Sequence, residues 1–509
     1  MNRRFIIILV FAALLAMTGC DNSMLADHPV DRDKADQTVL AAVYLLEYIA
    51  YMNQPTTTVS GRVVLCSLNN TGNPNVRINM KGRFEDKTVY TDSNGNFTIN
   101  DIRPGDFVLT ALRQGFAFIP PQQTVTLTAS GMSNISFETM ITWDRKIGGS
   151  GWEKAYSVEQ TNDCGYIVAG YTDSHDIGNL DFYIIKFDIY GNIQWDQRYG
   201  GSNSEISYSV QQTSDGGYVA AGYTYSYGSG INDFWIIKLD SLGSLIWQKT
   251  FGGSEWDEAR SIRQTTDNGY IVAGTTESFS LEGSDYWILK LDSGGNSVEG
   301  WVNGKTYGGA YTDEIRCIQQ TQDGGFVVTG NTEVSNDGNI DINIKKINSS
   351  GDVEWSRNYD YGKNDEANDI QVTTDGGFIV TGCSGNDFGD AIILKINSSG
   401  ELEWEKKYGG TYTDKAYSIK QTTDGGYIVA GYTYSSDTTD IDIYIIKLDE
   451  DGNEQWSRTF NNNESDEDIA YSIRQTADGG YVVVGSTTSY NNKKDIWIIK
   501  LNGLGVTIP

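Results

Sequence analysis

The chain lacks the residues on which most metal and nucleophilic chemistry depends. Among 509 residues only two are histidine, and Cys66, Cys164, Cys317 and Cys383 lie far apart with no CxxC pair. These counts argue against a zinc site and a Ser-His-Asp triad, and the cysteine spacing predicts no disulfide framework. Proline is scarce as well, at 7 residues against 57 glycines, which excludes a collagen-like or proline-rich disordered chain.

Positive charge is also in short supply. The chain has 38 lysines and arginines against 67 aspartates and glutamates, a formal net charge of −29. Such a chain repels nucleic-acid phosphates and anionic lipid headgroups, so we expect no nucleic-acid partner and no adsorption to a membrane surface. Solubility outside the cell is the simplest explanation of the charge.

One long apolar run stands at the N-terminus. The basic residues MNRR precede the run at residues 5–17, and small residues then lead to Cys20. This order resembles a bacterial lipoprotein signal, which implies a signal peptide over residues 1–19 and a lipid on Cys20. A plain secretory signal and an uncleaved anchor are the alternatives. We therefore expect an exported protein held only by its lipid to the cell membrane or outer membrane, facing the periplasm or the exterior.

Two different stretches follow the anchor. Residues 20–56 are expected to hold the lipid anchor, a linker and a short helix, which Pro55 ends. Residues 57–140 alternate apolar and polar residues between Gly, Asn and Pro turns, which predicts a small antiparallel β-sandwich of about seven strands. The order TDSNGNFTI, then PGDFVLT, resembles the carboxypeptidase regulatory-like (prealbumin-like) domain. That resemblance implies an accessory or stalk module without catalytic residues.

Residues 141–509 repeat a unit of about 50 residues, a length typical of propeller and solenoid repeats. Each unit has four strand-like runs joined by Asp-Gly or Gly-Asn dipeptides, which supply the positive φ of tight hairpins. A tryptophan marks each unit: Trp143, Trp195, Trp247, Trp301, Trp355, Trp404 and Trp456. Seven such units predict a seven-bladed β-propeller. The expected fold is therefore all-β, with a short N-terminal helix and a small sandwich before the propeller.

The two ends of the repeat array indicate how the ring closes. The array begins with a fourth-strand run at Trp143 and ends just after a third-strand run at residues 495–502. We therefore predict that the strand of Trp143 completes the last blade. The repeats resemble those of bacterial and archaeal secreted β-propeller proteins, with partial similarity to kelch and quinoprotein repeats. Such proteins range from binding scaffolds to enzymes, so the resemblance implies a fold rather than an activity.

Two acidic positions recur in all seven units, and both lie on one face of the disc because first and third strands run the same way. The first opens strand one: Glu153, Glu205, Asp257, Asp313, Asp365, Asp414 and Asp468. The second opens strand three: Asp181, Asp233, Asp285, Asp341, Asp390, Asp442 and Asp495. No cofactor is predicted, but the second set is a weak candidate for a metal site, for which Ca²⁺ is the suitable ion. The alternative, favoured by recurrence in every blade, is that each carboxylate caps a turn or pairs with a lysine. The recurrent lysines and tryptophans are expected to be structural for the same reason.

The loops between strands two and three vary in length and share that face. Aromatic residues in these loops are the candidate ligand-binding residues: Tyr223, Tyr225, Tyr227, Phe279, Tyr432, Tyr434 and Tyr490. Aromatic rings beside Asp, Asn and Ser suit carbohydrate or peptide recognition, and an ordinary solvated rim is the alternative. Blade five departs most from the repeat, with a shortened loop and Cys383.

These patterns predict a non-catalytic binding or assembly scaffold at the cell envelope, with an envelope polysaccharide or a protein as its partner. No catalytic residue is predicted, and an enzyme is the less favoured class. The first alternative is a carbohydrate-active hydrolase or lyase with acidic residues in the propeller funnel, and the second is a purely structural surface protein. An enzyme should break the sevenfold pattern in one or two blades with convergent polar groups, whereas a scaffold can use the whole rim.

Overall fold

The computed structural model describes residues 43–66, 68, 70–114, 116–174, 179–335, 338–385, 389–434, 440–461, 467–489 and 493–507. The expected signal peptide, Cys20 and Tyr490 lie outside these residues. Residues 43–52 are helical, and the described part of the chain holds no helix long and apolar enough to cross a membrane. The chain folds into two compact units, with a boundary between Thr139 and Met140.

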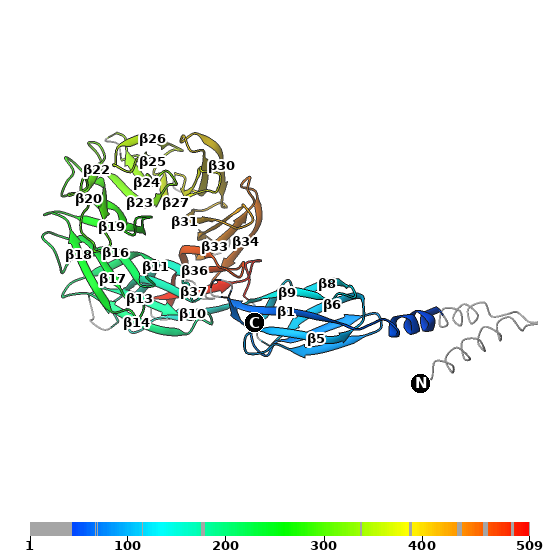
Figure 1. Ribbon diagram of the computed structural model, residues 1–509. Coiled ribbons are helices and arrows are strands. Elements are labelled where there is room, and N and C mark those ends of the chain that lie inside the picture. The colour runs from blue at the N-terminus through cyan, green and yellow to red at the C-terminus, as the bar shows by residue number, and fades with distance from the viewer. Residues whose placement is uncertain are drawn as a thin grey trace, which may run out of the picture. The chain divides into compact units, whose positions relative to one another are not determined.

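The first unit is a β-sandwich of two sheets (Figure 1). One sheet has the order β2-β1-β9-β7, with β5 paired to β1, and the other has the order β4-β3-β6-β8. Alternate residues such as Val63, Phe97 and Phe137 are buried and form its apolar core. The strands are β1 (Thr57–Cys66), β2 (Thr71–Gly72), β3 (Arg77–Gly82), β4 (Asp86–Tyr90), β5 (Asn96–Ile102), β6 (Gly105–Leu112), β7 (Ala117–Ile119), β8 (Gln122–Leu127) and β9 (Met132–Met140).

The sandwich differs from the expectation in two details. It has nine strands rather than about seven, and β1 pairs with β9 in parallel, with Val63 opposite Phe137. A parallel pair requires a long connection, and here all the strands from β2 to β8 lie between the two partners in the sequence. Alternation of apolar residues identifies strands but does not say which strands become neighbours, so the sequence could not reveal this pairing.

The second unit is a ring of seven four-stranded antiparallel sheets, which confirms the expected propeller (Figure 1). The first strand of each blade lines the centre of the ring. Blades one to three contain β11 (Glu153–Gln160), β12 (Tyr166–Thr172), β13 (Asp181–Phe187), β14 (Ile193–Tyr199), β15 (Glu205–Gln212), β16 (Tyr218–Thr224), β17 (Asp233–Leu239), β18 (Leu245–Phe251), β19 (Asp257–Gln264), β20 (Tyr270–Thr276), β21 (Asp285–Leu291) and β22 (Lys305–Tyr307). Blades four to six contain β23 (Asp313–Gln320), β24 (Phe326–Glu333), β25 (Ile340–Ile347), β26 (Val353–Tyr359), β27 (Glu366–Val372), β28 (Phe378–Cys383), β29 (Ala391–Ile396), β30 (Leu402–Tyr408), β31 (Asp414–Gln421), β32 (Tyr427–Tyr434), β33 (Ile441–Leu448) and β34 (Glu454–Phe460).

Blade seven is built from both ends of the repeat array. Its sheet has the order β10-β37-β36-β35, made of β10 (Trp143–Ile147), β35 (Ile469–Gln475), β36 (Tyr481–Ser489) and β37 (Lys493–Leu501). Trp143 pairs with Lys500, and Ile147 pairs with Ile496, which confirms the predicted closure. Closure gives every blade two neighbours, so no apolar blade face is left open at an end of the array.

The recurrent lysine of strand three holds the hairpin between strands one and two. In blade two, Lys238 Nζ lies 3.0 Å from Asp215 Oδ2, while Thr213 Oγ1 and Gly217 N donate to Asp215 Oδ1 at 2.5 and 2.9 Å. Burial opposes ionisation, but these three donors lower the pKa of Asp215 to about 2. The same ion pair forms at all seven lysines, which are therefore structural as expected: Lys186, Lys238, Lys290, Lys346, Lys395, Lys447 and Lys500.

Other recurrent residues join neighbouring blades. Trp195 contacts Tyr218 of the next blade with ring centroids 5.7 Å apart, and the other six tryptophans repeat this contact, which confirms their predicted packing role. Gln264, at the end of its first strand, accepts a hydrogen bond from Ser214 N of the preceding blade at 2.8 Å. The motif is therefore repeated because each copy supplies contacts to the blades on either side of it.

The structure corrects the expectation about cysteine. Cys164 is disulfide-bonded, whereas Cys317 and Cys383 are free and buried. Cys164 has a φ of 63° in the blade-one hairpin, at the position where blade two has Gly216 with a φ of 83°. Wide spacing along the sequence does not prevent a disulfide, because the fold decides which cysteines come within bonding distance.

Candidate functional site

The first-strand carboxylates are buried caps rather than an exposed acidic ring. Glu205 is 0% exposed; its Oε2 accepts the N–H of Gly201 at 2.9 Å, and its Oε1 accepts the hydroxyl of Thr224 at 2.8 Å. The equivalent backbone bond reaches five further carboxylates: Glu153, Asp257, Asp313, Asp365 and Asp414. These bonds match the turn-capping alternative, and burial corrects the expectation that this set rings the surface of the disc.

At several blade junctions, a third-strand aspartate lies beside the cap of the next blade. A Cβ on Gly252 would lie 1.9 Å from Asp233 Oδ1 and 2.8 Å from Asp257 Oδ2, so glycine is what allows the two carboxylates to approach. Three more glycines separate equivalent pairs: Gly200, Gly308 and Gly409. In one of these pairs, burial and then the charge of Asp313 raise the pKa of Asp285 to about 6.

The junction between blades four and five carries a third carboxylate. Asp360 stands where five of the other six junctions have glycine, and the carboxylate oxygens of Asp341, Asp360 and Asp365 all lie within 4.8 Å of one another. Asp365 already accepts the N–H groups of Tyr361 and Gly385. Hard oxygen ligands suit Ca²⁺, so the calcium expectation stays a prediction at this junction.

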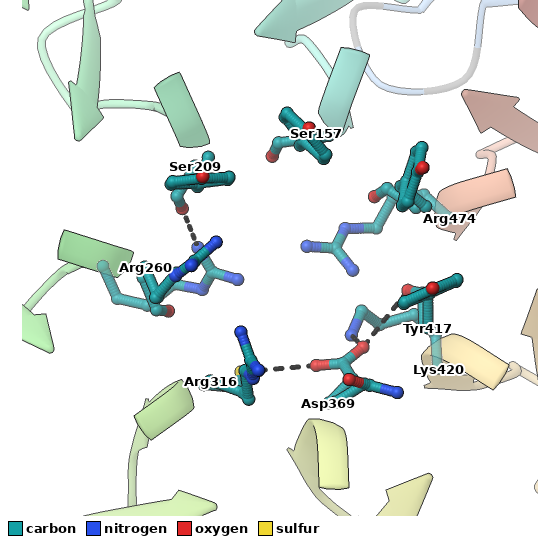
Figure 2. Close-up of a pocket in the computed structure, with 17 residues that line it drawn as sticks. Ser157, Ser209, Arg260, Arg316, Asp369, Tyr417, Lys420 and Arg474 are labelled. Atoms are coloured by element: carbon teal, nitrogen blue, oxygen red, sulfur yellow. Dashed lines mark hydrogen bonds and ion pairs between the residues drawn. The ribbon is translucent and has the colours of Figure 1, made fainter. Parts of the chain in front are cut away.

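Two polar cavities with shared lining residues lie at the centre of the propeller, and together we call them the channel; Figure 2 shows the residues that line the first of them. The first strands line the channel at three levels: a β-bulge in each first strand brings two consecutive residues, such as Tyr156 and Ser157, to the channel, and alternation brings the residue two positions further on to the same side. The tyrosine–arginine level consists of Tyr156, Tyr208, Arg260, Arg316, Asn368, Tyr417 and Tyr471. The serine level consists of Ser157, Ser209, Ser261, Cys317, Asp369, Ser418 and Ser472. The glutamine level, further from the loop face, consists of Glu159, Gln211, Arg263, Gln319, Gln371, Lys420 and Arg474.

The serine level joins blades. Ser157 Oγ accepts the N–H of Val210 in the next blade at 3.3 Å, and Ser209 Oγ accepts that of Ile262 at the same distance. Three further serines repeat this bond: Ser261, Ser418 and Ser472. The serines are therefore part of the scaffold, and function must be sought among the residues that differ between blades.

One half of the tyrosine–arginine level is aromatic. Tyr156 contacts Tyr208 and Tyr471 with ring centroids 5.0 and 4.9 Å apart. Ring contacts continue to the loops in two directions: through Tyr223 and Tyr225 to Trp256, and through Tyr417 and Tyr432 to Tyr434. We term these nine rings the aromatic arc. Its members are partly exposed, up to 44% at Trp256. Burial raises the pKa of Tyr156 to about 12, so its phenol is neutral and can both donate and accept a hydrogen bond.

Blades three to five supply a charged half opposite the arc (Figure 2). Arg260 pairs with Glu258 at 2.5 Å, and Arg316 pairs with Glu314 at 2.7 Å. The two halves meet where the guanidinium carbon of Arg260 lies 4.0 Å from the ring centroid of Tyr208. A cavity of about 150 Å³ lies against both arginines. On this side, three successive blades place a glutamate two residues before the tyrosine–arginine level: Glu258, Glu314 and Glu366.

Asp369 is a buried carboxylate that accepts hydrogen bonds from three neighbouring groups and pairs with a lysine. It accepts hydrogen bonds from Ser418 Oγ at 3.1 Å, Ile419 N at 3.0 Å and Cys317 Sγ at 3.3 Å, and forms an ion pair with Lys420. Burial raises the pKa of Asp369, and burial followed by the charge of Asp369 raises that of Cys317 to about 11. Cys317 is therefore a neutral thiol near pH 7 and a poor nucleophile.

Comparisons with known proteins describe parts of this chain. Residues 57–141 match the family model of the second β-sandwich domain of NOMO1-like subunits of the BOS complex. That match supports a β-sandwich here and names a different family from the carboxypeptidase regulatory-like domain that the sequence resembles. Among curated proteins, none matches this chain.

Solved structures are similar to this chain at low identity and low TM-score. Sqt1 from Chaetomium thermophilum has 12% identity and a TM-score of 0.40 over 68% of this chain and 82% of its own. BBS1N, crystallised with ARL6DN, has 12% identity and a TM-score of 0.42 over 72% and 97%. A PL25 ulvan lyase has 10% identity and a TM-score of 0.46 over 70% and 96%. Similarity at this level bears on neither the ligand nor the activity of this protein.

The predicted aromatic residues fall into two groups. Four of them belong to the aromatic arc: Tyr223, Tyr225, Tyr432 and Tyr434. Tyr227 and Phe279 instead pack on Trp235 and Trp287 of their own third strands, with ring centroids 5.4 and 4.9 Å apart. The arc therefore includes four of the predicted loop aromatics and extends from them into the channel, and their role in ligand binding stays a prediction.

The channel itself was missed by sequence reasoning, although the repeats carry a signal for it. The third residue after each first-strand acid is tyrosine in four blades but Arg260, Arg316 and Asn368 in blades three to five. Blade five was expected to depart most because of its loop, yet blades three and four depart as clearly along the channel wall. Aligning the repeats on the first strand, rather than comparing loop lengths, would have found these residues.

Proposed function

We propose that this protein is an exported binding scaffold whose ligand lies at the loop-face mouth of the channel, between the aromatic arc and the charged half. The observation that carries the proposal is the arc, in which nine partly exposed rings in continuous contact face Arg260 and Arg316. Aromatic faces stack on the apolar faces of sugar rings, while guanidinium and phenol groups hydrogen-bond their hydroxyls. An envelope polysaccharide is therefore the first ligand to test, and a protein partner is the second.

The test is calorimetric binding of the full chain to a panel of envelope oligosaccharides. Tyr225→Ala and Tyr434→Ala shorten the arc at its partly exposed ends, so both variants should fold and bind about tenfold more weakly, a loss of about 1.4 kcal/mol. Tyr190→Ala is the matched control, because Tyr190 is 37% exposed and lies in the β13–β14 hairpin, on the opposite face. Equal loss in all three variants, or none in the arc variants, would exclude the arc as the site. A panel without any binding would instead favour a protein partner or a purely structural role.

A carbohydrate-active hydrolase or lyase is the alternative, and one observation favours it. Glu258, Glu314 and Glu366 stand on successive blades, and this is where the sevenfold pattern breaks. Their ion pairs with Arg260, Arg316 and Lys415 fix the positions of the three side chains, which suits ligand positioning. Chromatography of each oligosaccharide after incubation with the protein tests this alternative. Cleavage by the wild type that is abolished in Glu258→Gln or Glu314→Gln would establish an enzyme.

The envelope location rests on the sequence before residue 43. We propose that Cys20 carries the lipid and that the sandwich is a spacer, as the carboxypeptidase regulatory-like resemblance implies. Labelling with a fatty-acid analogue should mark the wild-type protein and leave Cys20→Ser unmarked. Labelling of both would contradict the proposed anchor.

A further inference from the structure

The end of the channel away from the loops has a chemistry of its own. We propose that the glutamine level binds a small hydroxylated oxyanion, such as a sugar acid or a sugar phosphate. This site lies beyond the serine level from the aromatic arc, and it does not depend on the function proposed above.

The glutamine level encloses enough space for one sugar unit. Its cavity measures about 360 Å³, near the small end of the range of roughly 300–1,000 Å³ typical of ligand pockets. The cavity and the narrower one above it share Arg263, Lys420 and Arg474, so the three cations face one continuous space. Figure 2 shows the side chains of Lys420 and Arg474 directed into the channel.

The charge at this level is opposite to that of the whole molecule. Three cations and one carboxylate, Glu159, line the cavity in a chain whose net charge is −29. Arg474 lies 3.7 Å from Glu159, and Lys420 is paired with the buried Asp369. Arg263 forms no ion pair among the described residues; its Nη1 donates only to Ser209 Oγ at 3.1 Å and to Ile262 O at 2.7 Å. A guanidinium so placed retains donors for an anion.

The glutamines add further donors. Gln211 Oε1 accepts the N–H of Gln264, and Gln371 Oε1 accepts the N–H of Gln421, each at 2.6 Å. These bonds fix the carbonyl oxygens against the wall, and within the described structure no group accepts from the amide nitrogens of Gln211 and Gln371. The level therefore offers many donors and few acceptors, which selects oxyanions and hydroxyl oxygens over cations. Glu159 is the one acidic acceptor for a ligand hydroxyl.

The test is equilibrium binding of the full chain to four probes: glucuronate, glucose 6-phosphate, inorganic phosphate and glucose. Both sugar anions should bind at least tenfold more tightly than glucose, because glucose offers no charge to Arg263 and Arg474. The better of the two sugar anions identifies the source of the oxyanion. Inorganic phosphate binding as tightly as the sugar anions would overturn the hydroxylated part of the proposal.

Two test variants introduce a residue that other blades already have at the same position. Arg263→Gln and Arg474→Gln place glutamine where three other blades have it: Gln211, Gln319 and Gln371. Each variant should keep the wild-type melting temperature to within a few degrees and weaken the sugar anions about tenfold. Lys249→Gln, on the outermost strand β18 of blade two, removes the same charge away from the channel and should change nothing. Unchanged affinity in both channel variants, or equal loss in the control, would overturn the proposal.

Discussion

At the residue scale, Asp285 shows the effect of placing two carboxylates close together across a blade junction. Asp285 is 8% exposed, its Oδ1 has no hydrogen-bond partner among the described residues, and Asp313 lies across the junction. Burial and then Asp313 raise its pKa to about 6 from an ordinary 3.8, and Lys345 only partly opposes them. The unfolded chain releases this proton near pH 4 and the folded chain near pH 6. The stability that the neutral carboxyl provides is therefore complete below about pH 4 and is lost as the pH rises through 6.

We therefore predict that Asp285→Asn stabilises the protein at pH 7.5, by on the order of 1 kcal/mol after solvent screening, and has no effect at pH 4. Urea unfolding at the two pH values measures this difference. The control is Asp323→Asn: a hydrogen bond from Thr321, and then Lys346, lower the pKa of Asp323 to about 2 against its burial. Asp323 thus contributes stability above pH 4 that is lost as the pH falls toward 2, and its replacement should destabilise the protein at pH 7.5. An Asp285→Asn effect that is the same at both pH values would contradict the assignment.

At the scale of elements, most blade junctions follow one plan, and the junction between blades four and five departs from it. Glycine separates the paired carboxylates at four junctions, and Asp360 adds a third negative charge between blades four and five. In a buffer with a chelator, we predict that Asp360→Asn raises the free energy of unfolding by about 0.5 kcal/mol, since water screens an exposed charge. Added Ca²⁺ should raise the melting temperature of the wild type more than that of the variant if the calcium expectation holds. Asp451→Asn, at an exposed hairpin, is the control and should respond to neither treatment.

The sequence predicts those elements whose pattern lies within a short segment of the chain, and it does not predict contacts between distant segments. Hairpins and strands follow from Asp-Gly turns and alternation, so the blades and the closing strand at Trp143 could be predicted. The parallel pairing of β1 with β9 and the disulfide at Cys164 depend on the approach of distant segments. The strand-one acids were located correctly in the sequence, yet their burial depends on the neighbouring blade, which no single repeat can show.

Prediction of the candidate site from the sequence meets the same limit. The loop residues Tyr223 and Tyr434 could be chosen because they are aromatic and stand in variable loops. The arc that includes them forms only when Tyr156 of blade one meets Tyr471 of blade seven, a contact made by ring closure. Arg260 faces these tyrosines only in the closed ring. From the sequence, only a comparison of aligned repeats could have suggested this arrangement.

In the molecule as a whole, one set of residues holds the scaffold together and a different set forms the proposed site. Residues common to all blades bind turns and neighbouring blades: the lysine–aspartate pairs and the tryptophans. Residues that differ between blades face the channel, with rings on one side and charges on the other. We therefore expect recognition in the channel, where the repeats differ, rather than around the rim as a whole.

The most direct test of this proposal is a crystal structure of the full chain with its tightest-binding oligosaccharide. We predict a sugar ring at the loop-face mouth, stacked on Tyr156 or Tyr208 and hydrogen-bonded to Arg260 or Arg316. A saccharide bound on the outer strands of the blades, or on rim loops away from the arc, would contradict recognition in the channel.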